Sequence, residues 1–323
     1  TRSSITVADN GIKHFDLYAF TDGTLADSFH SDNLDGAGRS GISLRLYPGR
    51  SYTFYALANH PTRLTGISEL DIQNYIWDVS GGYASVNSNG FPMCWTGSAT
   101  ISNGTRISIG LDRLLSKWTF TFDMSNLPTL RAKSVVMKQT ASGVAPFKAS
   151  YTATSSSSTG DRSISADITA INAGRSATSY VPENMQGTLL PNNTSSYGKT
   201  YDALVAAGKS AQAARCTYLE VIGEFDESGS EPPYSGEIIY RFYLGKNLTT
   251  NFDIERNTEY AITIKPSVDS PTSEAIVWEV DNSGVTVNEW VHGTIEYSHT
   301  VAQYNGQWGY IDFPEATASD MVR

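Results

Sequence analysis

The feature that most constrains the fold is the alternation of apolar and polar residues over many short stretches of the chain. In residues 12–20, for example, Phe15, Leu17 and Ala19 fall on one face of an extended strand. The 18 tyrosines and 27 glycines, against only 5 methionines, also favour strands and turns over helices. Helical stretches do not alternate regularly with these segments, which argues against a parallel βαβ fold. The pattern therefore predicts an all-β protein.

A few short helices are expected within this all-β fold. Residues 68–75 (SELDIQNY) predict one of them, with Ser68 as its N-cap. Residues 197–214 are rich in alanine and free of proline, so they predict helix as well.

The length of 323 residues is enough for two ordinary domains. A stretch rich in serine and threonine, Ser150–Ser163, lies near the middle of the chain and is either a linker or a long loop. Strand-like alternation continues on both sides of it. We therefore expect a β-sandwich domain over residues 1–145, a second one over residues 146–297, and an extended tail over residues 298–323.

Charge and hydropathy argue against two kinds of partner. The formal net charge of −10 is the wrong sign for a surface that follows nucleic-acid phosphates, so no nucleic acid is expected. No apolar run approaches the ~20 residues that a membrane-spanning helix needs. The first residues have neither the charged nor the apolar region of a signal peptide, so we expect any such peptide to have been removed.

Several short motifs come close to known sites but lack an essential residue. Gly208-Lys209-Ser210 has Ala203 where a phosphate-binding loop needs glycine. Residues 31–36 (SDNLDG) lack the anchoring carboxylates of a calcium-binding loop, and a hairpin tip explains them better. The five histidines form no metal-binding pair at helical spacing, no GxSxG motif occurs, and no motif selects a carboxylate pair for glycoside hydrolysis. We therefore expect a protein that is not an enzyme, with no catalytic residue, cofactor or metal.

One group of aromatic residues leaves a binding role open. Trp77, Tyr83, Phe91 and Trp95 lie in a stretch rich in glycine, asparagine and serine, where exposed rings could form a platform for a sugar. Aromatic residues are also common in strands, where they pack into cores or cross-strand pairs. A cell-surface carbohydrate-binding module is therefore the alternative function.

Four segments of the second half follow one another in an order that resembles a known family. They are YVPENMQG (180–187), CTYLEVIGEF (216–225), YRFYLGKNLTTNFDIERNTEYAITI (240–264) and VWEVDN (277–282). This order resembles the fimbrillin-type (type V) pilins, which are fimbrial shaft and accessory subunits of Gram-negative gut and oral bacteria. Segments of the first half, such as LYPGRSYTFYALAN, are similar to the same family, so the resemblance covers residues 12–291.

The resemblance implies two consecutive transthyretin-like β-sandwich domains of the Greek-key type. It also implies a lipoprotein precursor, lipid-anchored to the outer membrane, that becomes part of a fimbrium at the cell surface. In this family an arginine-directed protease removes an N-terminal segment, and a C-terminal strand of a neighbouring subunit fills the groove that is left. Arg2 is the residue at which such cleavage is expected; the alternative is that residue 1 is only where the sequence happens to start.

The C-terminal residues supply candidates for this donor strand. Ile295, Tyr297, His299 and Val301 share one face of an extended stretch, and residues 308–313 (WGYIDF) are a second candidate. The tail is longer than one donor strand requires, so it is either a donor strand or the start of a third domain. This length favours an accessory, anchor or tip subunit over the main shaft protein.

We therefore expect a non-catalytic fimbrial subunit with a structural or adhesive role that assembles by strand donation. Its expected partners are other fimbrial subunits, together with glycans or proteins of host or bacterial surfaces.

The polar insert within the most specific of these segments raises a separate question. Asp253, Glu255 and Asn257 would point the same way in an extended chain, but without further ligands they form an incomplete metal site. Arg256 lies among these carboxylates, and Asn257 can hold the turn before the next strand. We therefore expect a salt-bridged connection between two strands that has no chemistry of its own.

Overall fold

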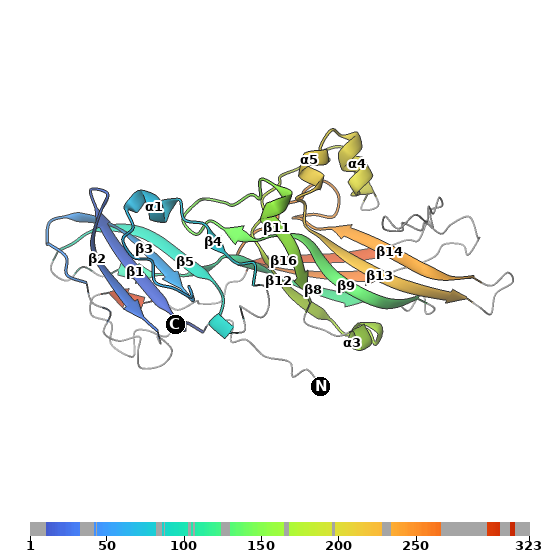
Figure 1. Ribbon diagram of the computed structural model, residues 1–323, viewed down its shortest axis with the longest axis horizontal. Coiled ribbons are helices and arrows are strands. Elements are labelled where there is room, and N and C mark those ends of the chain that lie inside the picture. Colours follow the sequence, from blue (N-terminus) through green and yellow to red (C-terminus); the bar gives the residue numbers. More distant parts are fainter. Residues whose placement is uncertain are drawn as a thin grey trace. The chain divides into compact units, whose positions relative to one another are not determined.

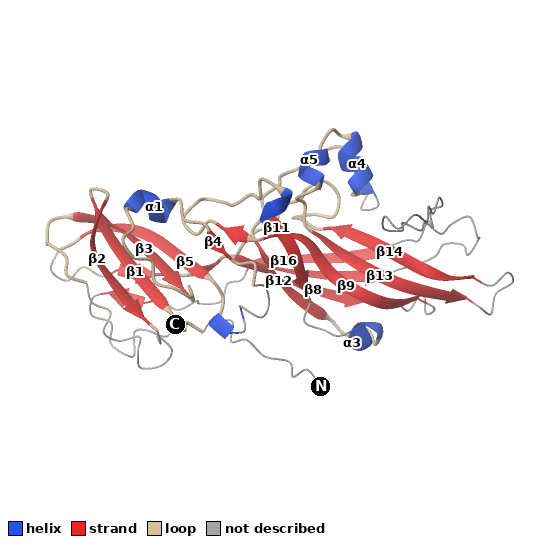
Figure 2. Ribbon diagram, viewed as in Figure 1, coloured by secondary structure: helices blue, strands red, loops and turns tan. Residues whose placement is uncertain are grey.

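The structure is a computed structural model of the chain (Figure 1). It describes residues 11–32, 42, 44–81, 86, 88–102, 105, 107–123, 130–164, 168–195, 198–227, 234–265, 296–303 and 311–313. Figure 2 shows that strands predominate over short helices in this part of the chain. The predicted all-β fold with few short helices is confirmed.

The chain divides into two compact units whose limits differ from the expected ones. The first unit is made of Thr1–Leu115, Gly143–Tyr151 and Gln303–Arg323, and the second of Ser116–Ser142 and Thr152–Ala302. The strands just before residue 145 pair with strands of the second unit, which is why residues 116–142 belong to that unit.

The first unit contains a five-stranded antiparallel sheet with the strand order β2-β1-β3-β5-β7. Its strands are β1 (Phe15–Thr21), β2 (Thr24–Ser31), β3 (Ser51–Ala58), β5 (Met93–Thr100) and β7 (Asp112–Arg113). Asp22 and Gly23 connect β1 to β2, and their φ angles of 52° and 75° suit the type I′ turn of a tight hairpin. The sheet order leaves β2 as an edge strand.

Two short strand pairs also belong to the first unit. β4 (Trp77–Asp78) pairs with β10 (Gly143–Val144) in antiparallel fashion. β6 (Ile107–Ile109) pairs in the same way with β17 (Ile311–Phe313), so the C-terminal part of the chain contributes a strand to this unit.

The helix predicted over residues 68–75 is present as α1 (Glu69–Gln73). Ser68 and Asp71 form a capping box, in which each side chain accepts a hydrogen bond from the backbone N–H of the other residue. Ile72 is buried and packs in one hydrophobic cluster with aromatic side chains of β1 and β3. The helix therefore covers one face of the sheet, because its apolar residue points toward the strands.

The second unit contains two four-stranded sheets, with the orders β11-β9-β13-β14 and β12-β8-β15-β16. The strands of the first sheet are β9 (Leu130–Ala141), β11 (Thr159–Ser163), β13 (Tyr218–Glu227) and β14 (Tyr234–Tyr243). Those of the second sheet are β8 (Leu115–Phe122), β12 (Ala177–Pro182), β15 (Thr258–Lys265) and β16 (Glu296–Gln303). β8 and β15 run parallel although they lie far apart in the sequence.

Short helices occur at the connections of the second unit. They are η2 (Ser156–Ser158), α3 (Ile168–Asn172), α4 (Tyr201–Ala206) and α5 (Ser210–Ala213). The helix predicted over residues 197–214 is therefore present as two short helices, α4 and α5. They meet at Gly208, whose φ of 72° is favourable only for glycine or a few polar residues.

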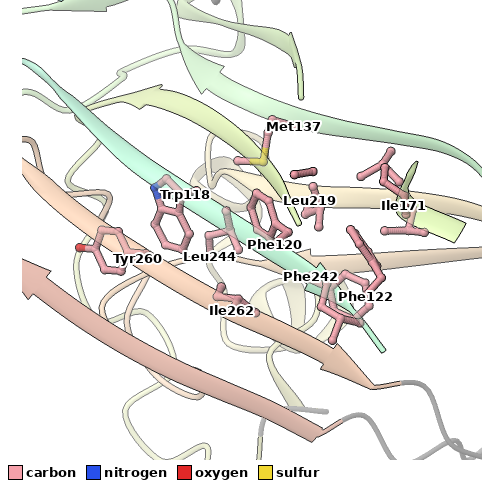
Figure 3. Close-up of a cluster of buried hydrophobic side chains, with 14 of the residues drawn as sticks. Trp118, Phe120, Phe122, Met137, Ile171, Leu219, Phe242, Leu244, Tyr260 and Ile262 are labelled. Atoms are coloured by element: carbon pink, nitrogen blue, oxygen red, sulfur yellow. The ribbon is translucent and has the colours of Figure 1, made fainter. Parts of the chain in front are cut away.

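Both sheets of the second unit supply side chains to one hydrophobic core (Figure 3). Trp118 and Phe120 come from β8, whereas Leu219 and Phe242 come from the other sheet. The Trp118 ring stacks on Tyr260 of β15, with ring centroids 4.0 Å apart and planes inclined by 12°. Trp118 and Tyr260 are both fully buried, so this stack is central to the packing of the unit.

Candidate assembly site

The predicted donor strand occupies a sheet position in its own chain. Tyr297, His299 and Val301 lie in β16, which is the neighbour of β15 at one edge of the second sheet. Ile295 lies outside the described residues. Figure 1 shows β16 running along the strands of this sheet. The described part of the tail thus extends the sandwich of the second unit.

The second donor candidate, residues 308–313, also supplies a strand. Its last three residues form β17, in which Ile311 lies opposite Ile109 and Phe313 opposite Ile107. Ile107 and Ile109 of β6 are buried, so β17 pairs with a strand that belongs to the interior of the first unit. The C-terminal stretch therefore contributes one strand to each unit.

β15 is the strand to which β16 is added. Tyr260, Ile262 and Ile264 point into the core and are at most 4% exposed, whereas Ala261 is exposed. One side of β15 pairs with β8 over the register from Glu259 to Ile264. The other side depends on β16 for partners, because a strand without a neighbour leaves a row of unpaired N–H and C=O groups.

The polar insert before β15 folds back on the segment that follows β12. Asn184 and Ile254 exchange two backbone hydrogen bonds of 3.0 Å, and the Phe252 N–H donates to the Gly187 carbonyl at 2.9 Å. Gly245 is required for this path, since a Cβ atom there would lie 2.0 Å from the carbonyl oxygen of Asn251. The motifs PEN and YLGKN, which are distant in the sequence, are thus neighbours in space.

Asp253 is the centre of this polar insert. The residue is 7% exposed, and its carboxylate accepts hydrogen bonds from the Gly187 N–H at 2.6 Å and from the Asn251 side-chain amide at 2.8 Å. The Lys246 ammonium lies 3.9 Å from Asp253 and 2.6 Å from Glu255. These contacts tie the loop to the segment that follows β12, so they give Asp253 a structural role.

The remaining polar residues of the insert complete a salt-bridged connection. The Arg256 guanidinium lies 3.5 Å from the buried carboxylate of Glu183. Asn257 has a φ of 53°, a left-handed conformation that asparagine tolerates well, and β15 begins at the next residue. The expectation of a salt-bridged turn between two strands therefore agrees with these contacts.

Two buried amides next to this insert are residues that sequence reasoning did not single out. The Asn184 oxygen accepts from the Ala153 N–H at 3.1 Å and from the Gln186 amide at 2.8 Å, while the Asn184 amide donates to the Arg215 carbonyl at 2.8 Å. The only signal in the sequence was two amide side chains within YVPENMQG, at the end of an apolar strand. Paired amides of this kind satisfy backbone groups that irregular segments leave open.

Lys199 is a third buried polar residue that sequence reasoning missed. It is 4% exposed, its ammonium donates to the Asn247 carbonyl at 2.8 Å, and it lies 4.6 Å from the centroid of the Phe252 ring. Burial lowers the pKa of Lys199 to about 7, although nearby Cys216 and Asp253 act in the opposite direction. Lys199 thus stabilises the start of the polar insert through its hydrogen bond to Asn247, while the burial of its charge costs desolvation energy.

We expect the stability of the second unit to increase from about pH 7 to about pH 9. The pKa of Lys199 is about 7 in the folded chain, whereas that of an unfolded lysine is about 10.4. Between these values the unfolded chain binds more protons than the folded chain, so raising the pH favours folding, by about 2 kcal/mol over this range. Urea unfolding at a series of pH values measures the slope.

Lys199→Met is expected to flatten this slope, because it removes the titrating amine. Lys133→Met is the matched control, since Lys133 is half-exposed and pairs with Glu224 at 3.6 Å on the surface. A slope that stays the same in Lys199→Met would show that the lysine is not its source.

The predicted sugar-binding aromatics do not gather on one surface in the part of the chain that is described. Trp77 is 4% exposed and packs on His60 with ring centroids 4.6 Å apart. Phe91 is 3% exposed, and Tyr83 lies outside the described residues. Trp95 is half-buried, and its ring lies close over Gly97 of the same strand. Two of the four rings thus belong to the core.

Other predicted features can be placed in the same way. Gly208-Lys209-Ser210 lies at the junction of α4 and α5 and not between a strand and a helix, as a phosphate-binding loop would. Within the described residues, no group of three or more His, Cys, Asp or Glu side chains is arranged to hold a metal ion. The helices of this part are too short or too polar to cross a membrane. Arg2 lies outside the described residues.

Comparison with known proteins gives one family match. Residues 179–264, from β12 to β15, match the model of a domain of unknown function (DUF4906). This range contains both the PEN motif and the polar insert. No curated protein sequence matches the chain.

Solved structures of fimbrial proteins resemble the chain over most of its length. The tip fimbrial protein Mfa3 from Porphyromonas gingivalis, with a C-terminal truncation, is 13% identical and gives a TM-score of 0.52 over 91% of this chain and 95% of that chain. Fimbrilin FimA from the same organism is 13% identical, with a TM-score of 0.53 over 93% of each chain. A candidate cell adhesion protein from Parabacteroides distasonis is 15% identical, with a TM-score of 0.57 over 94% of this chain and 92% of that chain. The chain has the fold of these fimbrial proteins, so the resemblance that its motifs indicated is confirmed at the level of the fold.

Proposed function

We propose that the chain is a non-catalytic fimbrial subunit that joins other fimbrial subunits by strand addition beside β15. The observation that carries this proposal is the position of β16, the expected donor strand, at the edge of the second sheet. The fold shared with a tip fimbrial protein and with a fimbrilin supports the same role. The contacts of Asp253, Lys246 and Arg256 are structural and support a role without catalysis.

The mechanism follows from the chemistry of a sheet edge. β16 occupies the place beside β15 within one chain, and a strand of a neighbouring subunit can form the same backbone hydrogen bonds. Each apolar side chain that such a strand buries contributes about 1.5–3 kcal/mol before the cost of ordering is subtracted. A strand exchanged in this way links subunits in series, because each chain both gives and receives one strand.

The position of the subunit in a fimbrium is part of the proposal. We infer a surface-exposed accessory, anchor or tip subunit, made as a precursor that is lipid-anchored to the outer membrane and processed near Arg2. The tail contributes two strands, β16 and β17, and this supports a tail that does more than donate a single strand. A shaft subunit would need only one donor strand.

Deleting residues 293–323 is expected to abolish assembly into multimers while both units stay folded. The control is a deletion of residues 304–323, which removes β17 and keeps β16. Multimers are measured by size-exclusion chromatography with light scattering and by electron microscopy. If the longer deletion assembled as well as the full chain, β16 would not be the donor. Loss of assembly in both deletions would instead assign the donor role to residues 304–323.

A further inference from the structure

Four side chains on the hairpin of β1 and β2 form a group that the proposed function does not use. His14 and Asp16 are two residues apart on the first strand side, and His30 and Asp32 repeat the same spacing on the second. In the antiparallel register Asp16 lies opposite His30, and the next pair in the same register is His14 with Asp32. These residues, here called the His/Asp quartet, therefore share one face and place a carboxylate across from each imidazole.

The contacts within the His/Asp quartet centre on His30. Its Nδ1 atom lies 2.7 Å from Asp16 Oδ1, and its Nε2 atom lies 3.0 Å from Asp32 Oδ1. The same Asp32 oxygen is 3.3 Å from His14 Nδ1. Both ring nitrogens of His30 thus face carboxylate oxygens.

These contacts determine how many protons His30 and its neighbouring carboxylates must hold together for the arrangement to be favourable. A neutral imidazole has one N–H donor, and its other nitrogen offers only a lone pair. With a carboxylate at each nitrogen, one lone pair would face another. The arrangement is favourable when one more proton is present, either on the ring of His30 or on the carboxyl group of Asp16.

His60 in the same unit shows the opposite arrangement. Its Nδ1 atom contacts the Thr62 carbonyl, and its Nε2 atom is 2.7 Å from the Tyr75 hydroxyl. A neutral ring satisfies both contacts, because Nδ1–H donates to the carbonyl and the hydroxyl donates to Nε2. Burial accordingly lowers the pKa of His60. The demand for an extra proton is therefore a property of His30 and its two carboxylates.

The surroundings of Asp16 also favour an additional proton at this place. Its side chain is 1% exposed, and its Oδ2 atom has no hydrogen-bond partner among the residues that the structure describes. Burial raises the pKa of Asp16, while the neighbouring His30, His60 and Arg63 act in the opposite direction. Tyr18 faces the same carboxylate, and Arg63 is held at 2.8 Å from the Ser28 hydroxyl. Burial, the largest of these effects, therefore disfavours the ionised form of Asp16.

We propose that the His/Asp quartet is a proton-operated clasp on the edge strand β2. The clasp is closed while Asp16 and His30 together hold one more proton than they would in a separated hairpin. Loss of this proton leaves two lone pairs facing each other and loosens the end of β2 from β1. Because β2 is the edge of the five-stranded sheet, the clasp links the acidity of the medium to the exposure of that edge.

Linkage gives the direction of the effect. When the hairpin is separated, the carboxylates are ionised above about pH 4 and the histidines lose their protons near about pH 6.5. The closed clasp then binds more protons than the open one. The opening constant of the hairpin therefore increases with pH above about 6.5, by up to about tenfold per pH unit for one proton.

Amide hydrogen exchange of β1 and β2 peptides in the full chain tests the clasp. Rates are measured between about pH 6.5 and 8.5 and corrected for the pH dependence of intrinsic exchange, which gives the opening constant of the hairpin. The wild-type constant is expected to increase with pH. In Asp16→Asn and in Asp32→Asn it is expected to stay flat, because the new amide N–H donates to one nitrogen of a neutral His30. Asp161→Asn, which removes the carboxylate 2.7 Å from Lys138 in the second unit, is expected to behave as wild type.

A second measurement covers the case in which a variant does not fold. Ring nitrogen shifts and the carboxyl carbon shift of Asp16 in the wild-type chain near pH 7 are expected to show the extra proton on His30, on Asp16 or shared between them, and one protonated nitrogen at His60. A flat wild-type opening constant, an unchanged slope in Asp16→Asn, or a neutral ring at His30 together with an ionised Asp16 carboxylate would each overturn the proposal.

Discussion

Replacing Trp118 with alanine is expected to lower the free energy of unfolding of the second unit by about 3–5 kcal/mol. The indole is fully buried, stacks on Tyr260 and Phe120, and lies between the two sheets (Figure 3). Its Nε1–H also donates to the Ser116 hydroxyl at 2.8 Å, and that hydroxyl donates to the Val181 carbonyl at 2.9 Å. The substitution removes a large apolar surface and one end of this hydrogen-bond relay.

Two further variants separate these contributions, with urea unfolding followed by circular dichroism. Trp118→Phe keeps an aromatic ring but loses the donor, so it is expected to cost about half as much as Trp118→Ala. Thr119→Ala changes the neighbouring residue, which points to the other face of β8 and is half-buried, and it is expected to cost less than about 1 kcal/mol. Equal effects of Trp118→Ala and Thr119→Ala would contradict the assignment of Trp118 to the centre of the core.

Asp253→Ala is expected to cost about 2–4 kcal/mol of folding stability. The variant leaves the Gly187 N–H and the Asn251 amide without their acceptors in a buried place, and each unsatisfied donor costs about 1–3 kcal/mol. Thermal and urea unfolding measure the change.

Glu255→Ala is the matched control for this loop. Glu255 is one-third exposed and pairs with the partly exposed Lys246, so its loss is expected to cost less than about 1 kcal/mol. If Asp253→Ala were as mild as Glu255→Ala, the buried hydrogen bonds of Asp253 would not stabilise the loop.

The sequence indicated the kind of fold because its signals are local. The alternation of β8 and β15 predicts strands, and Ser68 with Asp71 predicts the start of α1, since both depend only on neighbouring residues. The polar insert was interpreted correctly as a salt-bridged turn for the same reason. Its charges have partners within the insert or in the PEN motif.

Pairing between distant segments was not accessible from alternation alone. β8 lies before the expected boundary at residue 145, but it pairs in parallel with β15 and so belongs to the second unit. The alternation of a strand predicts which of its faces is apolar, but it does not predict which strand it pairs with. Trp77 and Phe91 show the same limit, because an aromatic residue in a strand fits a core and a surface platform equally well.

Buried polar residues were the other part that the sequence did not reveal. Lys199 and Asp16 are charged residue types that usually lie at the surface, and only the structure shows that they are nearly enclosed. Asp16 stands in an alternating strand, but both faces of β1 are covered. Burial of this kind depends on what packs over the strand, which comes from residues far away in the chain.

Amide hydrogen exchange on β15 tests the central claim most directly. The experiment compares Thr258–Ile264 in the full chain, in the chain lacking residues 293–323, and in that shortened chain with a synthetic peptide of residues 293–303 added. We predict strong protection in the full chain, loss of protection on the side of β15 that faces β16 after the deletion, and its return when the peptide binds. Protection that is the same in the full and the shortened chain would contradict the claim that β15 accepts the donor strand.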